Sequence, residues 1–134
     1  LGFKPENIIL VGVRRESENI DDREYKYANE EEIRIIYLDE FEERREEIIE
    51  FVSGGKVYCS FDIDAFDSSL IKSTGYVEDN GLMEDEVFEL LGDVKENIFG
   101  FDLVEINLEK GSEEDKKETL RVGRKLLKTV AGKE

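Results

Sequence analysis

The sequence lacks histidine and tryptophan, and its 134 residues include only one cysteine and one proline. One cysteine cannot close a disulfide within the chain, so the expected location is a reducing compartment, the cytoplasm. With no histidine to act as a base, Cys59 is interpreted as a core residue of a strand rather than a nucleophile. Runs of about 18 apolar residues are absent and no signal peptide precedes the first expected strand, so we expect no membrane partner. The chain starts at Leu1 instead of methionine, which indicates part of a longer protein.

Basic residues are also scarce. The 19 lysines and arginines face 35 aspartates and glutamates, and the formal net charge is -16. Nucleic-acid binding normally needs a basic face, so we expect no nucleic-acid partner. An acidic surface suits metal cations or cationic small molecules, although such surfaces often serve only solubility.

Apolar runs alternate with amphipathic, charge-rich segments along the whole chain. Strands are expected at 7–13, 33–38, 56–63 and 97–106, and helices at 40–52, 84–91 and 113–130. Near-continuous apolar strands separated by helices are typical of βαβ units. The sequence therefore predicts the α/β class, with a mainly parallel sheet covered by helices on both faces.

Two local features of the first half carry structural expectations. Asp39 is expected to be the N-cap of helix 40–52. Arg14 and Arg15 follow the first strand and could pair with acids at the same sheet edge, but a place in a solvated loop is favoured.

Three aspartates end the third expected strand, in the stretch "SFDIDAFD". If the strand continues through them, Asp62 and Asp64 lie on one face, where they repel each other unless a cation lies between them. Carboxylates are the ligands that hard divalent ions such as Mn²⁺ and Mg²⁺ prefer. The alternative is that one aspartate caps a turn and the other is solvated.

Two other motifs that begin with aspartates are excluded. An EF-hand loop counted from Asp62 needs a glycine at its sixth position and a glutamate at its twelfth, and these positions hold Asp67 and Ser73. Phe66 breaks the pattern of haloacid-dehalogenase-type phosphatases.

The fourth expected strand ends in a second group of polar residues, within "GFDLVEIN". Asp102, Glu105 and Asn107 interrupt an otherwise apolar run, which is costly for buried carboxylates without partners. In α/β sheets, ligands bind at the carboxyl ends of strands. Both acidic strand ends together predict a negative pocket suited to metal ions and a cationic substrate.

The order "SFDIDAFD", "SSLIKSTGYVEDNGL" and "GFDLVEIN" resembles the C-terminal half of the arginase/agmatinase (ureohydrolase) family. Its pattern runs S-F-D-x-D-x-x-D-P, T-G-T-P, G-G-L and D-x-x-E-x-N-P. The flanking segments "ENIILVGVR" and "EEDKKETLRVGRKLL" also resemble the family, so the resemblance covers nearly the whole chain. It implies a three-layer α/β/α fold of which residues 1–134 are the C-terminal portion. It also implies a pair of Mn²⁺ ions, at which hydroxide attacks a guanidinium carbon and urea leaves.

The resemblance assigns roles to individual residues. Asp62 and Asp64 match metal ligands, and Glu105 matches the catalytic carboxylate that receives the substrate's guanidinium. Thr74 falls in the substrate-binding segment together with Glu105. Two further acids, Asp67 and Asp102, match residues that support the site without direct chemistry.

Several family features are missing. The histidine-bearing segments that supply the other metal ligands belong to an N-terminal half, and this chain has no histidine. Within the matching half, family prolines are replaced by Ser68, Val77 and Leu108, and the second threonine of T-G-T-P by Tyr76. We therefore expect the chain to be inactive alone and to need the missing half or a homologous subunit, with a homo-oligomer as the expected assembly.

The expected function is that of a Mn²⁺-dependent hydrolase converting a cationic guanidino compound to an amine and urea, with this chain as its C-terminal half. The competing hypothesis is a non-catalytic remnant of the fold that acts as a binding or regulatory protein. A third hypothesis is a split enzyme with its N-terminal half on another chain.

Overall fold

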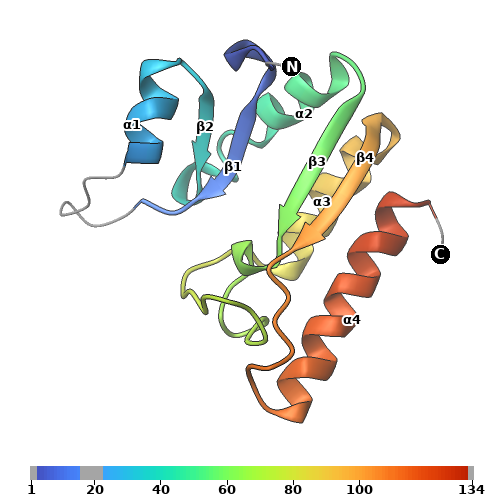
Figure 1. Cartoon of the computed structure of the whole chain (residues 1–134). Helices are drawn as coiled ribbons and strands as arrows, with labels where there is room; N and C mark the ends of the chain where they lie inside the picture. The colour runs from blue at the N-terminus through green and yellow to red at the C-terminus, as the bar shows by residue number, and fades with distance from the viewer. Residues whose placement is uncertain (1–2, 16–22, 133–134) are drawn as a thin grey trace. The chain divides into compact units, whose positions relative to one another are not determined.

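The computed structural model describes residues 3–15 and 23–132, which fall into two compact units, 1–48 and 49–134. The first unit contains strands β1 (Ile9–Val13) and β2 (Arg34–Tyr37), which pair in parallel. Helix α1 (Arg23–Glu30) comes between them in the sequence and lies beside β2 (Figure 1). Short 3₁₀ turns lie at Pro5–Asn7 and Leu38–Glu40, and helix α2 (Arg45–Ser53) runs across the boundary between the units. Ile35, Ile36 and Phe41 form part of the buried core.

Arg15 is bound where β1 and β2 end. Its Nε donates to both carboxylate oxygens of Asp39 at 3.1 Å, and its guanidinium carbon lies 3.9 Å from the centre of the Tyr37 ring. Arg15 thus lies in an exposed loop, as predicted, and it also forms the alternative contact, a pair with acids at the sheet edge. The prediction of Asp39 as an N-cap is wrong, because Asp39 lies within the 3₁₀ turn and α2 begins only at Arg45.

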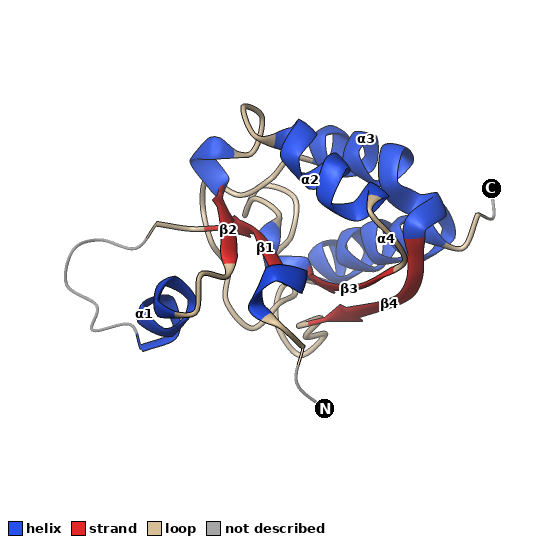
Figure 2. Cartoon of the chain, turned by 90° about the horizontal axis from the view of Figure 1, so that it is seen from above, coloured by secondary structure: helices blue, strands red, loops and turns tan. Residues whose placement is uncertain are grey.

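The second unit is built around strands β3 (Val57–Asp62) and β4 (Ile98–Val104), which are also parallel. Ser60 pairs with Asp102, and Asp62 pairs with Val104. Helices α3 (Glu84–Val94) and α4 (Glu113–Val130) lie on one face of this pair (Figure 2). Further 3₁₀ turns lie at Ile63–Ala65 and Lys95–Asn97. The predicted α/β class with parallel strands is confirmed.

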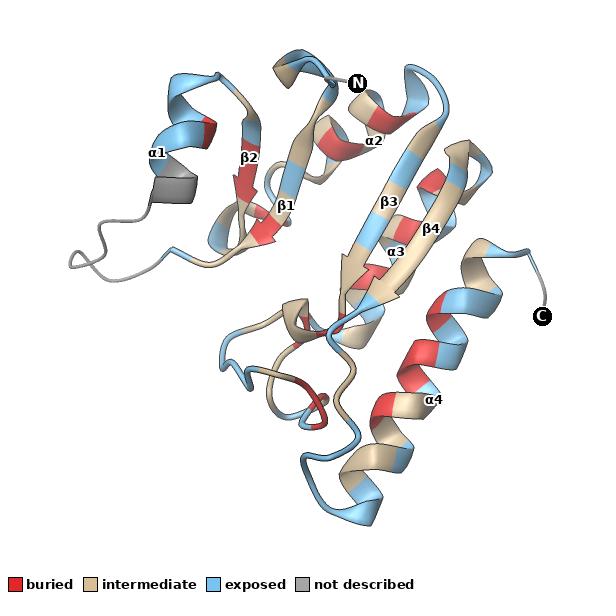
Figure 3. Ribbon diagram, viewed as in Figure 1, coloured by how far each residue is buried: buried red, intermediate tan, exposed pale blue. Residues whose placement is uncertain are grey.

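Helix α4 shows why this segment folds as it does. The Ser112 hydroxyl caps the first turn by accepting the Asp115 N–H at 3.2 Å, and the Asp115 carboxylate accepts the Ser112 N–H at 2.9 Å. Thr119, Val122 and Leu126, three or four residues apart, form the buried stripe visible in Figure 3. None of the helices in the described residues is long and apolar enough to cross a membrane.

An ion cluster joins α3 to α4 and yields a testable prediction. Glu84 accepts hydrogen bonds from Arg121 at 3.1 Å and Lys125 at 2.7 Å, and these partners, Arg121 first, lower its pKa to about 2. Because the pKa is lowered in the folded state, the stabilisation is present above the unfolded pKa of about 4.5 and is lost as pH falls toward 2. Glu84→Gln is expected to lower the free energy of unfolding by about 1 kcal/mol at pH 7, with the difference disappearing near pH 2.

Urea titrations between pH 7 and pH 2 measure this effect. Asp85→Asn is the control, since it removes the same charge from an exposed position in the same helical turn. Equal losses in the two variants, or a Glu84→Gln loss that does not change with pH, would contradict the prediction.

Candidate functional site

The first two predicted site residues follow one another where β3 ends. Asp62 is the last residue of the strand, and its Oδ1 accepts the Asp64 N–H at 3.0 Å, which caps the turn Ile63–Ala65. The strand therefore does not continue through Asp64, and the same-face argument from strand alternation does not apply. Capping occupies one oxygen of a group that has two, so it does not prevent Asp62 from binding a cation.

Two carboxylates make only part of a metal centre. Among residues 3–15 and 23–132, no group of three histidines, cysteines, aspartates or glutamates is arranged to hold an ion. Oxygen ligands suit hard divalent cations, but such ions take more than two ligands. The described residues thus fit a contribution to a metal site and do not complete one.

Glu105 follows β4 at the same edge of the sheet. It comes directly after Val104, the register partner of Asp62, so the ends of β3 and β4 bring Asp62 and Glu105 into neighbouring positions. Its φ of 65° is left-handed, a conformation that is uncommon for residues other than glycine. The side chain is exposed. This residue is therefore held in a specific, strained conformation with its carboxylate accessible.

The segment around Thr74 contacts Glu105 directly. Thr74 is fully buried, and its hydroxyl donates to the Glu105 carbonyl oxygen at 2.9 Å. Thr74 also forms an isolated antiparallel bridge with Ile106. Its predicted contact with substrate stays a prediction; in this structure the hydroxyl holds the backbone of Glu105.

Asp67 organises the loop between β3 and α3. Its carboxylate accepts the Ser69 N–H at 2.9 Å and the Gly81 N–H at 3.1 Å. Hydrogen bonds from Ser69, through its hydroxyl and its N–H, and from Gly81 lower the pKa of Asp67. The two ends of the loop are joined by a parallel bridge between Phe66 and Leu82. All these contacts are with the loop itself.

Asp102 lies within β4 and contacts the neighbouring strand. The Tyr58 hydroxyl donates to its Oδ2 at 2.5 Å, and the hydroxyls of Ser60 and Tyr58 lower the pKa of the carboxyl group. Two residues separate Asp102 from the end of the strand. Its partners are thus cross-strand hydroxyl groups. Sequence patterns gave no signal for this contact, because Tyr58 precedes Asp102 by 44 positions.

Cys59 is the one thiol of the sequence. Burial, followed by the nearby charge of Asp102, raises its pKa to about 11. The group is therefore protonated at neutral pH, and a thiol is a much weaker nucleophile than a thiolate.

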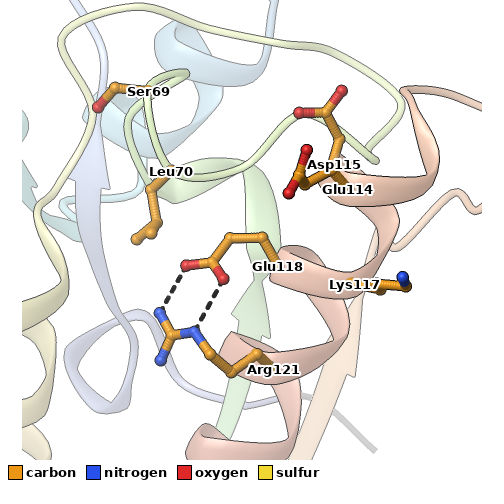
Figure 4. Close-up of a pocket in the computed structure, with 7 residues that line it drawn as sticks. All are labelled: Ser69, Leu70, Glu114, Asp115, Lys117, Glu118 and Arg121. Atoms are coloured by element: carbon orange, nitrogen blue, oxygen red, sulfur yellow. Dashed lines mark hydrogen bonds and ion pairs between the residues drawn. The ribbon is translucent and has the colours of Figure 1, made fainter.

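A shallow pocket lies between the loop after β3 and the start of α4 (Figure 4). Its lining residues are Ser69, Leu70, Glu114, Asp115, Lys117, Glu118 and Arg121. Within it, Arg121 and Glu118 form an ion pair along one turn of α4. None of the predicted site residues lines this pocket.

Comparison with known proteins supports an assignment. A model of the arginase family matches residues 1–132. Guanidinobutyrase from Pseudomonas aeruginosa is 29% identical over 108 residues, covering 76% of this chain and 33% of that protein. Mitochondrial guanidino acid hydrolase from Homo sapiens is 28% identical over 106 residues, covering 75% of this chain and 30% of that protein.

The fold also matches solved structures. Proclavaminate amidino hydrolase from Streptomyces clavuligerus superposes with a TM-score of 0.75 at 29% identity, covering 96% of this chain and 44% of that one. The chain thus spans less than half of that structure and about a third of the two sequence relatives.

Proposed function

The chain belongs to the arginase family, and from this premise we propose that it is the C-terminal part of a Mn²⁺-dependent ureohydrolase. The complete protein would hydrolyse a cationic guanidino compound to an amine and urea. The observation that carries the proposal is that Asp62 and Glu105 occupy neighbouring positions at one sheet edge, since Val104 is the register partner of Asp62 and Glu105 follows it. That edge is the place where α/β sheets bind ligands.

The proposal gives the predicted acids different roles. Asp62 and Asp64 would contribute two of the ligands of a pair of Mn²⁺ ions, and the rest of the protein would contribute the others. When bound, a metal pair supplies an activated water near neutral pH. Asp67 and Asp102, whose contacts are with their own loop and the neighbouring strand, would support the site without touching the substrate.

Glu105 would bind the guanidinium group. A carboxylate and a planar guanidinium form two parallel charge-assisted hydrogen bonds, which fix both the position and the orientation of the cation. The exposed side chain is accessible for this contact. Orienting the guanidinium carbon toward the activated water is the contribution expected of the residue.

A substitution of Glu105 tests this role in the complete protein. Glu105→Gln keeps the shape of the side chain and removes its charge. We expect kcat/KM for urea release to fall about 10- to 100-fold, the loss that corresponds to hydrogen bonds to a charged group. Bound Mn²⁺ should stay unchanged. The measurement is a urea assay with 4-guanidinobutyrate, L-arginine and agmatine. Glu109→Gln, an exposed glutamate four residues later, is the control and should leave kcat/KM unchanged.

A non-catalytic protein of the same fold is the second candidate function. It is favoured by the lack of any three-ligand metal group among residues 3–15 and 23–132. If the complete protein releases no urea from any of the three guanidino compounds and binds no Mn²⁺, the catalytic proposal fails and this candidate replaces it.

We also propose that the chain works in association, with the remaining part of the protein, on the same or another chain, or with a homologous subunit in a homo-oligomer. Tyr58 of β3 is 66% exposed in this unit, and its ring is the contact that a partner would cover. A reducing cytoplasm is the proposed location, since the sequence has a single cysteine.

A further inference from the structure

Glu105 has a left-handed backbone conformation, with a φ of 65°. A left-handed residue with a β-carbon costs roughly 1–2 kcal/mol relative to the right-handed form, so neighbouring contacts must hold it there. Two consecutive residues of the loop before α3 adjoin Glu105: Thr74 through a hydrogen bond, and Gly75 through the space beside its carboxylate. Neither contact follows from the chemistry proposed for the site.

Thr74 holds the backbone of Glu105. Its buried hydroxyl donates to the Glu105 carbonyl oxygen at 2.9 Å, and the Asn107 N–H donates to the Ser73 carbonyl at 2.9 Å. Thr74 and Ser73, the residue before it, are therefore both hydrogen-bonded to the segment that begins at Glu105. This pairing fixes the direction in which Glu105 leaves β4.

Because Gly75 has no side chain, it leaves room for the Glu105 carboxylate. A β-carbon at position 75 would lie 2.9 Å from Oε2 of Glu105, closer than real contacts allow. The carboxylate is the flexible end of its side chain and could move aside. A side chain at Gly75 would therefore displace the carboxylate at little cost in stability. Lys110 holds this glycine from another direction, because its Nζ donates to the Gly75 carbonyl at 2.6 Å.

We propose that Thr74 and Gly75 are positioning residues that set the backbone and the carboxylate of Glu105 for guanidinium binding. The inference rests on the proposed function of Glu105, and it gives Thr74 an action through that residue instead of a contact with substrate. Misplacement of a binding group by about 1 Å can reduce a rate about 100-fold, so small movements of this carboxylate matter.

The first test compares two glycine-to-alanine substitutions in the complete protein. Gly75→Ala should lower kcat/KM for 4-guanidinobutyrate about 10- to 100-fold, mainly through KM, while the unfolding midpoint and bound Mn²⁺ remain unchanged. Gly92→Ala is the matched control, since a β-carbon there meets nothing within 4 Å. Equal kinetics in the two variants would overturn the role of Gly75.

The second test removes and restores the hydroxyl. Thr74→Val should lower kcat/KM and speed amide hydrogen exchange in the peptide containing Glu105–Asn107, whereas Thr74→Ser should restore both. Unchanged exchange in Thr74→Val would overturn the role of Thr74. If the wild-type protein hydrolyses none of the three guanidino compounds, the proposed function fails, but the exchange comparison still decides whether Thr74 positions Glu105.

Discussion

Asp64→Ala in the complete protein is expected to reduce urea release at least about 1,000-fold and to lower the amount of Mn²⁺ that stays bound after dialysis. A metal ion that loses a carboxylate ligand loses both affinity and the charge balance that activates its water. Asp64 is half-buried in the turn after β3, where its N–H already bonds to Asp62. Alanine keeps that N–H, so the cap of the turn remains and only the carboxylate is lost.

Metal content by mass spectrometry and a urea assay measure the two effects on the same preparation. Asp85→Ala is the charge-matched control, since it removes an exposed carboxylate from α3. Turnover and Mn²⁺ content equal to the wild type in Asp64→Ala would remove Asp64 from the metal site. Loss of turnover with full Mn²⁺ content would assign Asp64 to another role in the reaction.

Gly81→Ala is expected to lower the free energy of unfolding by about 3 kcal/mol or more, because the new side chain meets backbone instead of a movable side chain. A β-carbon at Gly81 would lie 2.3 Å from the Asp67 nitrogen and 2.3 Å from the Phe66 carbonyl carbon. Relief requires the loop to open at the bridge between Phe66 and Leu82. The Asp67 carboxylate would then lose the Gly81 N–H as well.

Thermal and urea unfolding of the complete protein measure this loss. Gly55→Ala is the control, since its β-carbon would meet nothing within 4 Å. A Gly81→Ala variant with the stability of the control would show that the loop relaxes at no cost, and the close packing at this position would then carry no structural role.

Local patterns in the sequence predicted most of the second unit. Helix 113–130 was predicted as an amphipathic segment, and α4 has the predicted bounds. The start of α2 was predicted too early. Aspartate is a favoured N-cap residue, but the Asp39 carboxylate is bound by Arg15, which lies 24 residues earlier. Side-chain pairing at such separations leaves no local trace in the sequence.

The acids of the candidate site were singled out from residue types and strand ends alone. Carboxylates at the ends of two strands pointed to Asp62, Asp64 and Glu105, and the parallel register places Asp62 and Glu105 in neighbouring positions. The contacts of Thr74 and Gly75 with Glu105 were not predictable. They depend on a left-handed backbone at a glutamate, a residue type that gives no signal for that conformation.

The left-handed backbone at Glu105 also bears on how this protein would respond to selection. Glycine adopts such a φ without steric cost, so Glu105→Gly relieves strain of roughly 1 kcal/mol while removing the carboxylate. A library screened for thermostability alone would therefore favour glycine at this position. Thermostability and the proposed guanidinium recognition would compete here for one residue, the trade-off expected where activity requires a conformation that the fold alone does not favour.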